Sequence, residues 1–140
     1  MQVKEIMNKN VVVAKKDITL KEASEVMYKL RIGSLVITEE QNIAGIVTST
    51  DILKAIANGK SPDTTLAGEI MSKDVVSIEP DITLQKAVDI MMKNKIKKLP
   101  VVSENKIMGM ITASDIIVVE PKLVETIASL CSLKAPYSGG

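Results

Sequence analysis

An internal repeat is the sequence feature that most constrains the fold of this chain. A shift of 64 residues aligns positions 5–53 with positions 69–117 without a gap, and 21 of the 49 aligned residues are identical. Identity on this scale indicates duplication of one structural unit. Between the copies, residues 59–65 hold Gly, Ser and Pro and are the only linker-like interior stretch. We therefore expect a first motif over 1–58, a linker over 59–65, a second motif over 66–120 and a C-terminal helix and tail over 121–140.

Each copy predicts the element order β-α-β-β-α. In the first copy the apolar run 11–13 predicts a strand, and Thr19 with Glu22 predicts a capping box that opens a helix. A hairpin over 34–37 and 43–47 and a helix that begins at Thr48 and stops at Asn58-Gly59 complete the copy. The second copy predicts a strand over 75–78, a helix over 83–94, strands over 99–102 and 107–111, and a helix from Ser114.

Size determines how the two copies combine. A motif of about 50 residues is marginal on its own. We therefore expect the copies to pack face to face around a pseudo-two-fold axis as one mixed α/β domain of the α+β type. Beyond the repeat, Pro121 opens a further helix with apolar residues at helical spacing up to Leu133, which predicts an additional packing or dimer element.

Composition argues against several functional classes. Lys and Arg number 18 against 17 Asp and Glu, so no overall charge draws the chain to nucleic acid or to an anionic membrane. The absence of histidine removes the usual general base and the commonest metal ligand, so we expect no enzyme, no metal site and no required cofactor. The single cysteine, the lack of a signal-peptide pattern and the lack of a long apolar run predict a cytoplasmic location.

The end of each hairpin carries the most informative polar residues. Each returning strand runs directly into a helix through a turn of hydroxyl residues and one carboxylate. Backbone N–H groups at such a turn attract anions, and a carboxylate that accepts two hydrogen bonds suits the vicinal hydroxyls of a ribose. Thr-x-x-Asp is equally the pattern of a helix N-cap with an acidic third residue, so both interpretations stay open. The candidate residues are Thr48, Thr50, Asp51, Thr112, Ser114 and Asp115.

Taken in order, the motifs of the two copies resemble a tandem CBS domain pair, or Bateman module, over about residues 5–120. The resemblance rests on Glu-Ile-Met, a short strand, Asp-Ile-Thr-Leu opening a helix, Leu-Pro-Val-Val, Gly-Met-Ile-Thr and Ser-Asp-Ile. It implies a stand-alone regulatory module that binds AMP, ADP, ATP, S-adenosylmethionine or sometimes NAD in two clefts between the halves. It also implies a homodimer.

The resemblance assigns roles to individual positions. Asp51 and Asp115 match the ribose-binding acid, and Thr48 and Thr112 match a hydroxyl that contacts ribose or phosphate. Each cleft draws on both copies. The positions that wall the adenine are Val13, Ile32, Ser77 and Ile96. The resemblance thus implies that Asp115 faces Asn8, Val13 and Ile32. It implies that Asp51 faces Ser72, Ser77 and Ile96.

Two lysines distinguish the copies. Lys97 and Lys98 match a basic pair that meets phosphate groups, whereas the aligned Gly33 and Ser34 carry no charge. Lysines also discourage aggregation when they lie on an edge strand, so this alternative remains open. The chain has no Trp and no Phe, so adenine would rest on aliphatic walls and single-stranded nucleic acid is an improbable ligand.

Two functions follow as hypotheses. The first is an adenosyl-ligand sensor that acts in trans on an effector protein still to be identified, because the chain shows no obvious effector domain. The alternative is a constitutive dimerisation or protein-interaction module with empty clefts, in which the Thr and Asp residues serve only as helix caps.

Overall fold

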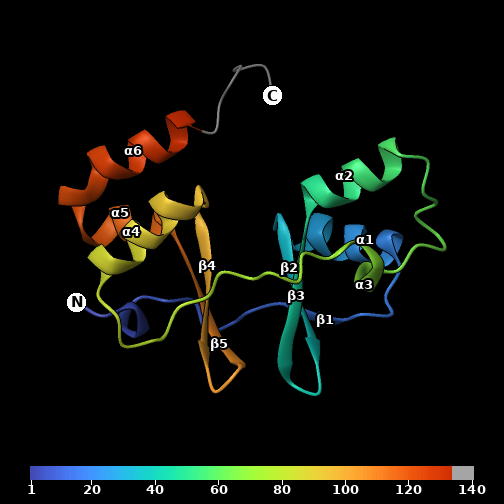
Figure 1. Cartoon of the computed structure of the whole chain (residues 1–140), viewed down its shortest axis with the longest axis horizontal. Helices are drawn as coiled ribbons and strands as arrows, with labels where there is room; N and C mark the ends of the chain where they lie inside the picture. Colours follow the sequence, from blue (N-terminus) through green and yellow to red (C-terminus); the bar gives the residue numbers. More distant parts are fainter. Residues whose placement is uncertain (134–140) are drawn as a thin grey trace. The chain divides into compact units, whose positions relative to one another are not determined.

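The computed structural model describes residues 1–133, which form two compact units (Figure 1). Unit 1 combines Met1–Val11 with the chain from Val76 onward, and unit 2 is Val12–Val75. Neither unit is one copy of the repeat as it runs along the sequence. The first eleven residues belong with the second copy, and residues 66–75 belong with the first.

Unit 2 is a three-stranded sheet packed against helices. Strand β1 (Val13–Lys15) pairs in parallel with β2 (Ser34–Glu39), which pairs antiparallel with β3 (Asn42–Thr48). Its helices are α1 (Leu20–Leu30), α2 (Ser49–Ala57) and α3 (Ala67–Ile70). The expected mixed α/β class is confirmed. The core is formed by Leu20, Ala23, Met27, Leu35, Ile37, Val47, Ile52, Ala55 and Ala67.

Unit 1 repeats this plan with an additional helix. The hairpin of β4 (Lys98–Ser103) and β5 (Lys106–Thr112) packs with α4 (Leu84–Asn94) and α5 (Ala113–Val119). The short 3₁₀ helices η1 (Val3–Glu5) and η2 (Pro121–Leu123) and the helix α6 (Val124–Leu133) complete it. Helix α6 contacts α4 and α5, so this helix is a packing element of its own unit. The rest of the predicted tail, residues 134–140, lies outside the described residues. The residues that η2 and α6 bury are Leu123, Ile127 and Leu130.

Hydrogen bonds at the helix starts explain where the helices begin. The predicted capping box of α1 is confirmed, because Thr19 Oγ1 accepts from the Glu22 N–H at 3.1 Å and Glu22 Oε1 accepts from the Thr19 N–H at 2.9 Å. The backbone N–H and then the hydroxyl of Thr19, both donating to the carboxylate, lower the pKa of Glu22. In α4 the cap is one-sided: Thr83 accepts from the Lys86 N–H, and Lys86 stands where α1 has its acid.

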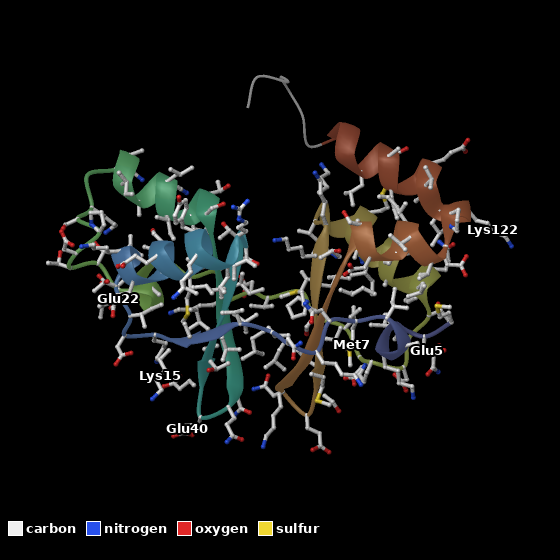
Figure 2. The ribbon with its side chains drawn as sticks, turned by 180° about the vertical axis from the view of Figure 1, so that it is seen from behind. Glu5, Met7, Lys15, Glu22, Glu40 and Lys122 are labelled. Atoms are coloured by element: carbon white, nitrogen blue, oxygen red, sulfur yellow. The ribbon has the colours of Figure 1, made fainter. Side chains whose placement is uncertain are left out.

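Both hairpins close on residues with left-handed backbone conformation. The turn residues Glu40 and Gln41 have φ of 51° and 71°, and Glu104 and Asn105 have φ of 53° and 64°. Two successive positive φ angles match the twist of paired strands. Figure 2 shows Glu40 at the tip of its hairpin.

The first strand of each copy differs from its prediction. In the first copy β1 lies over Val13–Lys15, two residues later than expected. In the second copy the expected strand over 75–78 is reduced to a single parallel bridge between Ile78 and Val101. Proline explains the loss: the Val36 N–H donates to the Val12 carbonyl, but the aligned Pro100 has no N–H to donate.

The segment at the start of each motif packs on the other motif. In unit 1, the Val3 N–H donates to the Ile82 carbonyl at 2.9 Å, and Asn8 exchanges two 2.9 Å hydrogen bonds with Met110. In unit 2, the aligned Ser72 exchanges hydrogen bonds of 2.9 and 3.0 Å with Ile46. Both segments therefore add backbone pairing to the hairpin strand that leads to the candidate turn.

One glycine in each unit permits this close approach. A Cβ on Gly45 would lie 2.7 Å from Met71 Sδ and 2.8 Å from the Ser72 carbonyl oxygen. A Cβ on Gly109 would lie 2.7 Å from Met7 Sδ, and Figure 2 shows Met7 beside β5. Real Cβ atoms do not approach neighbours this closely, so both positions exclude a side chain.

Substitution of either glycine by alanine is therefore expected to destabilise the protein. Gly45→Ala and Gly109→Ala should each lower the free energy of unfolding by about 1–3 kcal/mol, because strand and segment must separate to admit the methyl group. Urea denaturation measures the effect. Gly59→Asn is the comparison without a steric clash: no atom lies within 4 Å of a Cβ there, and asparagine is among the residues that best tolerate its positive φ of +87°, so this variant should cost less than either alanine variant. Unchanged stability in both alanine variants would contradict the close packing.

Candidate functional site

The two candidate turns have the same geometry. Thr48 Oγ1 accepts from the Asp51 N–H at 3.1 Å, and Asp51 Oδ2 accepts from the Thr48 N–H at 2.9 Å. In the other turn Thr112 and Asp115 make the same two hydrogen bonds, both at 3.1 Å. Each pair is a complete capping box at the first turn of α2 or α5. The helix-capping role suggested by the sequence is thus present in both units.

Capping leaves part of each carboxylate unused. Only Oδ2 of Asp51 and of Asp115 enters the box, and within residues 1–133 no group donates to Oδ1. Both side chains are half-buried. Every fully buried side-chain oxygen of the described residues has a hydrogen-bond partner. Because Oδ1 of each aspartate has none, it must be accessible to solvent. The Thr48 and Thr112 hydroxyls act as acceptors in the box and retain their protons for donation. Capping and ligand binding are therefore compatible at the same residues.

In unit 1 several of the predicted residues meet at the end of β5. Lys98 is the register partner of Thr112, and the Ala113 N–H donates to the Lys97 carbonyl at 2.8 Å. Asn8 is exposed and pairs with Met110, two residues before Thr112. Lys97, Lys98 and Ser114 are all exposed. The backbone of unit 1 thus brings two exposed lysines and an asparagine to the strands beside the turn.

The remaining unit 1 positions lie on flanking segments. Ser77 is exposed and precedes the bridging residue Ile78, and Ile96 is partly buried against the unit 1 core. Both were assigned to a group with Asp51, which belongs to unit 2. That grouping stays a prediction.

Unit 2 has the same arrangement without the positive charge. Ser34 is the register partner of Thr48, and the Ser49 N–H donates to the Gly33 carbonyl at 2.9 Å. Ser72 takes the place of Asn8 through its pairing with Ile46, and Thr50 is exposed on the first turn of α2. The two turns therefore differ chiefly in electrostatics.

The aliphatic wall residues of the first copy also lie in unit 2. Val13 on β1 is 46% exposed, and Ile32 is partly buried against the core. The resemblance groups them with Asp115, which belongs to unit 1, so this grouping too stays a prediction.

Sequence reasoning missed one hollow in unit 1. A cavity of about 190 Å³ lies at the start of α4, where the chain's first residue meets the α5–η2 connection. Its lining combines segments more than 80 positions apart in the sequence, which no local motif reveals. The lining residues are Met1, Thr83, Leu84, Gln85, Glu120, Lys122 and Leu123.

Two other features are absent from residues 1–133. Among the described side chains in that range, no group of three or more His, Cys, Asp or Glu is arranged to hold a metal ion. No helix in the same range is long and apolar enough to cross a membrane. Cys131, the single cysteine, has a side chain outside the described part.

Comparison with known proteins identifies the fold family. The family model described as CBS domain matches residues 3–58 and 67–121. The uncharacterized protein MK0525 of Methanopyrus kandleri is 42% identical over 111 residues, which are 75% of this chain and 57% of that protein. The chain thus corresponds to little more than half the length of MK0525.

Two solved structures have closely similar folds. One is the CBS domain pair of protein MJ0100 in complex with 5′-methylthioadenosine and S-adenosyl-L-methionine, with a TM-score of 0.78, 31% identity, and coverage of 87% of this chain and 97% of that chain. The other is the hexameric CBS-CP12 protein from bloom-forming cyanobacteria, with a TM-score of 0.74, 31% identity, and coverage of 89% and 74%. From the matched family model and these neighbours, we conclude that this chain belongs to the CBS domain family as a tandem pair.

Proposed function

We propose that this chain is a regulatory sensor of an adenosyl ligand (AMP, ADP, ATP or S-adenosylmethionine) and that it has no catalytic role. The observation that carries the proposal is the unused Oδ1 of Asp51 and Asp115, which reaches solvent beside hydroxyl groups in both turns. The MJ0100 domain pair, which is 31% identical, holds two adenosyl compounds. The same ligand class is therefore the first to test here.

The chemistry of the turns suits a ribose. Oδ1 of each aspartate is a charged acceptor for a ribose hydroxyl, and the Thr48 or Thr112 hydroxyl donates to a ribose or phosphate oxygen. Thr50 and Ser114 supply further hydroxyls. In this proposal the adenine rests on aliphatic positions, since the chain has no Trp or Phe. The wall and neighbouring positions are Val13, Ile32, Ser77, Ile96, Asn8 and Ser72.

Regulation requires that the ligand favour one of two states. A ligand shifts such an equilibrium only by its difference in affinity for the two states. In the proposal the output passes to an effector protein in trans, in the cytoplasm, from a self-associated form of the chain. The hexameric CBS-CP12 neighbour supports self-association as a property to test.

A constitutive dimerisation or interaction module is the second candidate. The observation that favours it is the completeness of both capping boxes, which gives Thr48, Asp51, Thr112 and Asp115 a structural role without any ligand. The two candidates make opposite predictions for added nucleotide.

Thermal unfolding in the presence of ligands decides between them. The panel is AMP, ADP, ATP, S-adenosylmethionine and NAD, each up to millimolar concentration. A bound ligand at 100 times its dissociation constant stabilises the folded state by about 2.7 kcal/mol, which raises the midpoint by several degrees. No shift with any ligand, even at millimolar concentration, would overturn the sensor and leave the constitutive module.

The lysine pair predicts a preference for phosphate at unit 1. The double variant Lys97→Ala/Lys98→Ala should weaken ATP binding about 10-fold or more through loss of charge-assisted hydrogen bonds, and leave 5′-methylthioadenosine binding nearly unchanged. Isothermal titration at low and high salt measures both. A matched control is Lys93→Ala/Lys95→Ala, which removes the same charge from exposed positions at the end of α4. Equal losses in the two double variants would show general electrostatic attraction rather than a phosphate contact.

A further inference from the structure

One short segment of unit 1 concentrates positive charge. Residues 93–98 hold four lysines and no acidic residue, and no other six-residue stretch of the sequence holds more than two Lys or Arg. All four lysines are exposed, and among the described residues none of them forms an ion pair or a side-chain hydrogen bond. We refer to Lys93, Lys95, Lys97 and Lys98 as the lysine cluster.

The lysine cluster spans the junction between α4 and β4. Lys93 lies in the last turn of α4, Lys95 follows the helix with φ of 56°, and Lys98 begins β4. The Cα atoms of Lys95 and Lys98 are separated by at most about 11 Å, because they are three residues apart. This is about one Debye length at 0.1 M salt. The positive charges therefore act together on an approaching anion.

Structural roles explain these lysines only in part. Positive side chains at a helix C-terminus interact favourably with its carbonyl groups, which accounts for Lys93 and Lys95. The first copy has two basic residues at the aligned positions and none directly after them. Lysines that discourage strand pairing at a sheet edge account at most for Lys97 and Lys98. Like charges repel one another, so the gathering of all four in one segment calls for a further reason.

A short acidic segment of a protein fits this surface better than a long polyanion does. Outside the lysine cluster the sequence has 14 Lys and Arg against 17 Asp and Glu, so an anion that extends past the cluster meets a chain of net negative charge. The residues between the lysines offer neither an aromatic platform for bases nor an exposed apolar anchor for a membrane: Asn94 is polar, and Ile96 is partly buried against the unit 1 core. An extended run of about six Asp or Glu residues, at about 3.3 Å per residue, covers the cluster alone.

We propose that the lysine cluster docks an acidic segment of the effector protein, and that the phosphate groups of a bound ligand displace this segment from Lys97 and Lys98. Both lysines lie beside the candidate turn: Lys98 is the register partner of Thr112, and the Ala113 N–H donates to the Lys97 carbonyl. Ligand phosphate and acidic segment therefore compete for the same two charges. The inference rests on the proposed function for its ligand and its effector, and it adds the chemistry of the effector and the means of its release.

Fluorescence anisotropy of a labelled hexaglutamate peptide at low salt tests the docking surface. The wild type should bind the peptide, and a variant with all four cluster lysines replaced by alanine should bind it at least about 10-fold more weakly, because each exposed charge pair contributes only modestly. The cluster substitutions are Lys93→Ala, Lys95→Ala, Lys97→Ala and Lys98→Ala.

The matched control removes the same charge from four exposed lysines that lie far apart in the sequence. Its substitutions are Lys21→Ala, Lys54→Ala, Lys60→Ala and Lys122→Ala. This variant should bind the peptide within about 3-fold of the wild type. Circular dichroism checks that both variants are folded.

Added nucleotide tests the displacement. Saturating ATP should weaken peptide binding to the wild type at least about 3-fold, as for two lost charge pairs. Inorganic triphosphate at equal ionic strength should weaken it less, because it lacks the adenosyl group that places the phosphates at the turn. Lys93→Ala/Lys95→Ala should bind the peptide about 3-fold more weakly and bind ATP as the wild type does, since only the acidic segment contacts these two lysines.

The results separate this inference from the sensor on which it rests. Equal peptide affinity in the wild type and the cluster variant, or an equal loss in the control, would overturn the docking surface. Tighter binding of a short DNA duplex or of phosphatidylserine vesicles than of the peptide would overturn it too. ATP binding without displacement of the peptide, or equal displacement by triphosphate, would overturn the competition. Cluster-dependent peptide binding in a protein that binds no nucleotide would support the docking surface and reject the sensor together with the competition.

Discussion

A fragment of residues 12–75 is expected to fold cooperatively, whereas the equally long fragment 1–64 is expected to remain unfolded. Both fragments hold 64 residues and both contain β1, β2, β3, α1 and α2. Fragment 12–75 contains the segment that follows the linker, residues 66–75. Fragment 1–64 instead contains the segment that precedes β1, residues 1–11. Circular dichroism and urea denaturation at low temperature distinguish the two results.

The reason is the exchange of segments between copies. Fragment 12–75 keeps Ala67, which is fully buried, and the hydrogen bond from the Ala67 N–H to the Ile18 carbonyl at 2.8 Å. It also keeps the pairing of Ser72 with Ile46 along β3. Fragment 1–64 loses these contacts and carries Val3, whose burial requires the second copy. The free energy of unfolding of a unit this small is low, so loss of a buried segment should abolish folding.

Gly45→Ala provides the control for this comparison. In fragment 12–75 the added methyl group meets Met71 and Ser72, so the variant should unfold at lower urea concentration. In fragment 1–64 both neighbours are absent and the substitution should have no such effect. A cooperative transition in 1–64 together with none in 12–75 would show that the compact unit follows the sequence repeat.

Local pattern was sufficient to predict most elements of the fold. Thr19 and Glu22 stand at capping-box spacing, and the structure forms that box because only neighbouring residues are needed. The strand predicted over 75–78 is wrong because its pairing depends on Pro100, more than 20 positions away, which lacks the required N–H. Contacts between distant residues are what local periodicity leaves undetermined.

The exchange of segments shows the same limit more sharply. Met7 lies against Gly109, and Met71 lies against Gly45. Both copies contain Glu-Ile-Met and the glycine, so pairing each methionine with the glycine of its own copy would make the same local contacts. The repeated sequence therefore predicts the fold of each copy but does not show that the segments are exchanged. The capping geometry was easier to predict, because each Thr and Asp pair lies within one helical turn and its hydrogen bonds are determined locally. The assembly of residues from both copies around one ligand depends on packing and stays a prediction.

Asp115→Asn is expected to separate ligand binding from helix capping. Asparagine keeps one side-chain oxygen to accept from the Thr112 N–H, so the box survives and the midpoint without ligand should change little. The second position becomes an NH₂ group, which donates where a ribose hydroxyl needs a charged acceptor. Affinity for the adenosyl ligand should therefore fall about 10- to 100-fold, as for one lost charged hydrogen bond. Isothermal titration measures the affinity and thermal unfolding measures the cap.

Asp115→Ala and Asp51→Asn complete the design. Alanine removes both functions, so Asp115→Ala should lose affinity and about 1 kcal/mol of stability, whereas Asp115→Asn should lose affinity alone. Asp51→Asn applies the same change to unit 2, where Gly33 and Ser34 stand in place of the lysine pair. If the lysine pair binds the phosphate, the affinity for a phosphate-bearing ligand should therefore fall more in Asp115→Asn than in Asp51→Asn. Wild-type affinity in both asparagine variants, with stability lost only in the alanine variant, would reduce these aspartates to helix caps and favour the constitutive module.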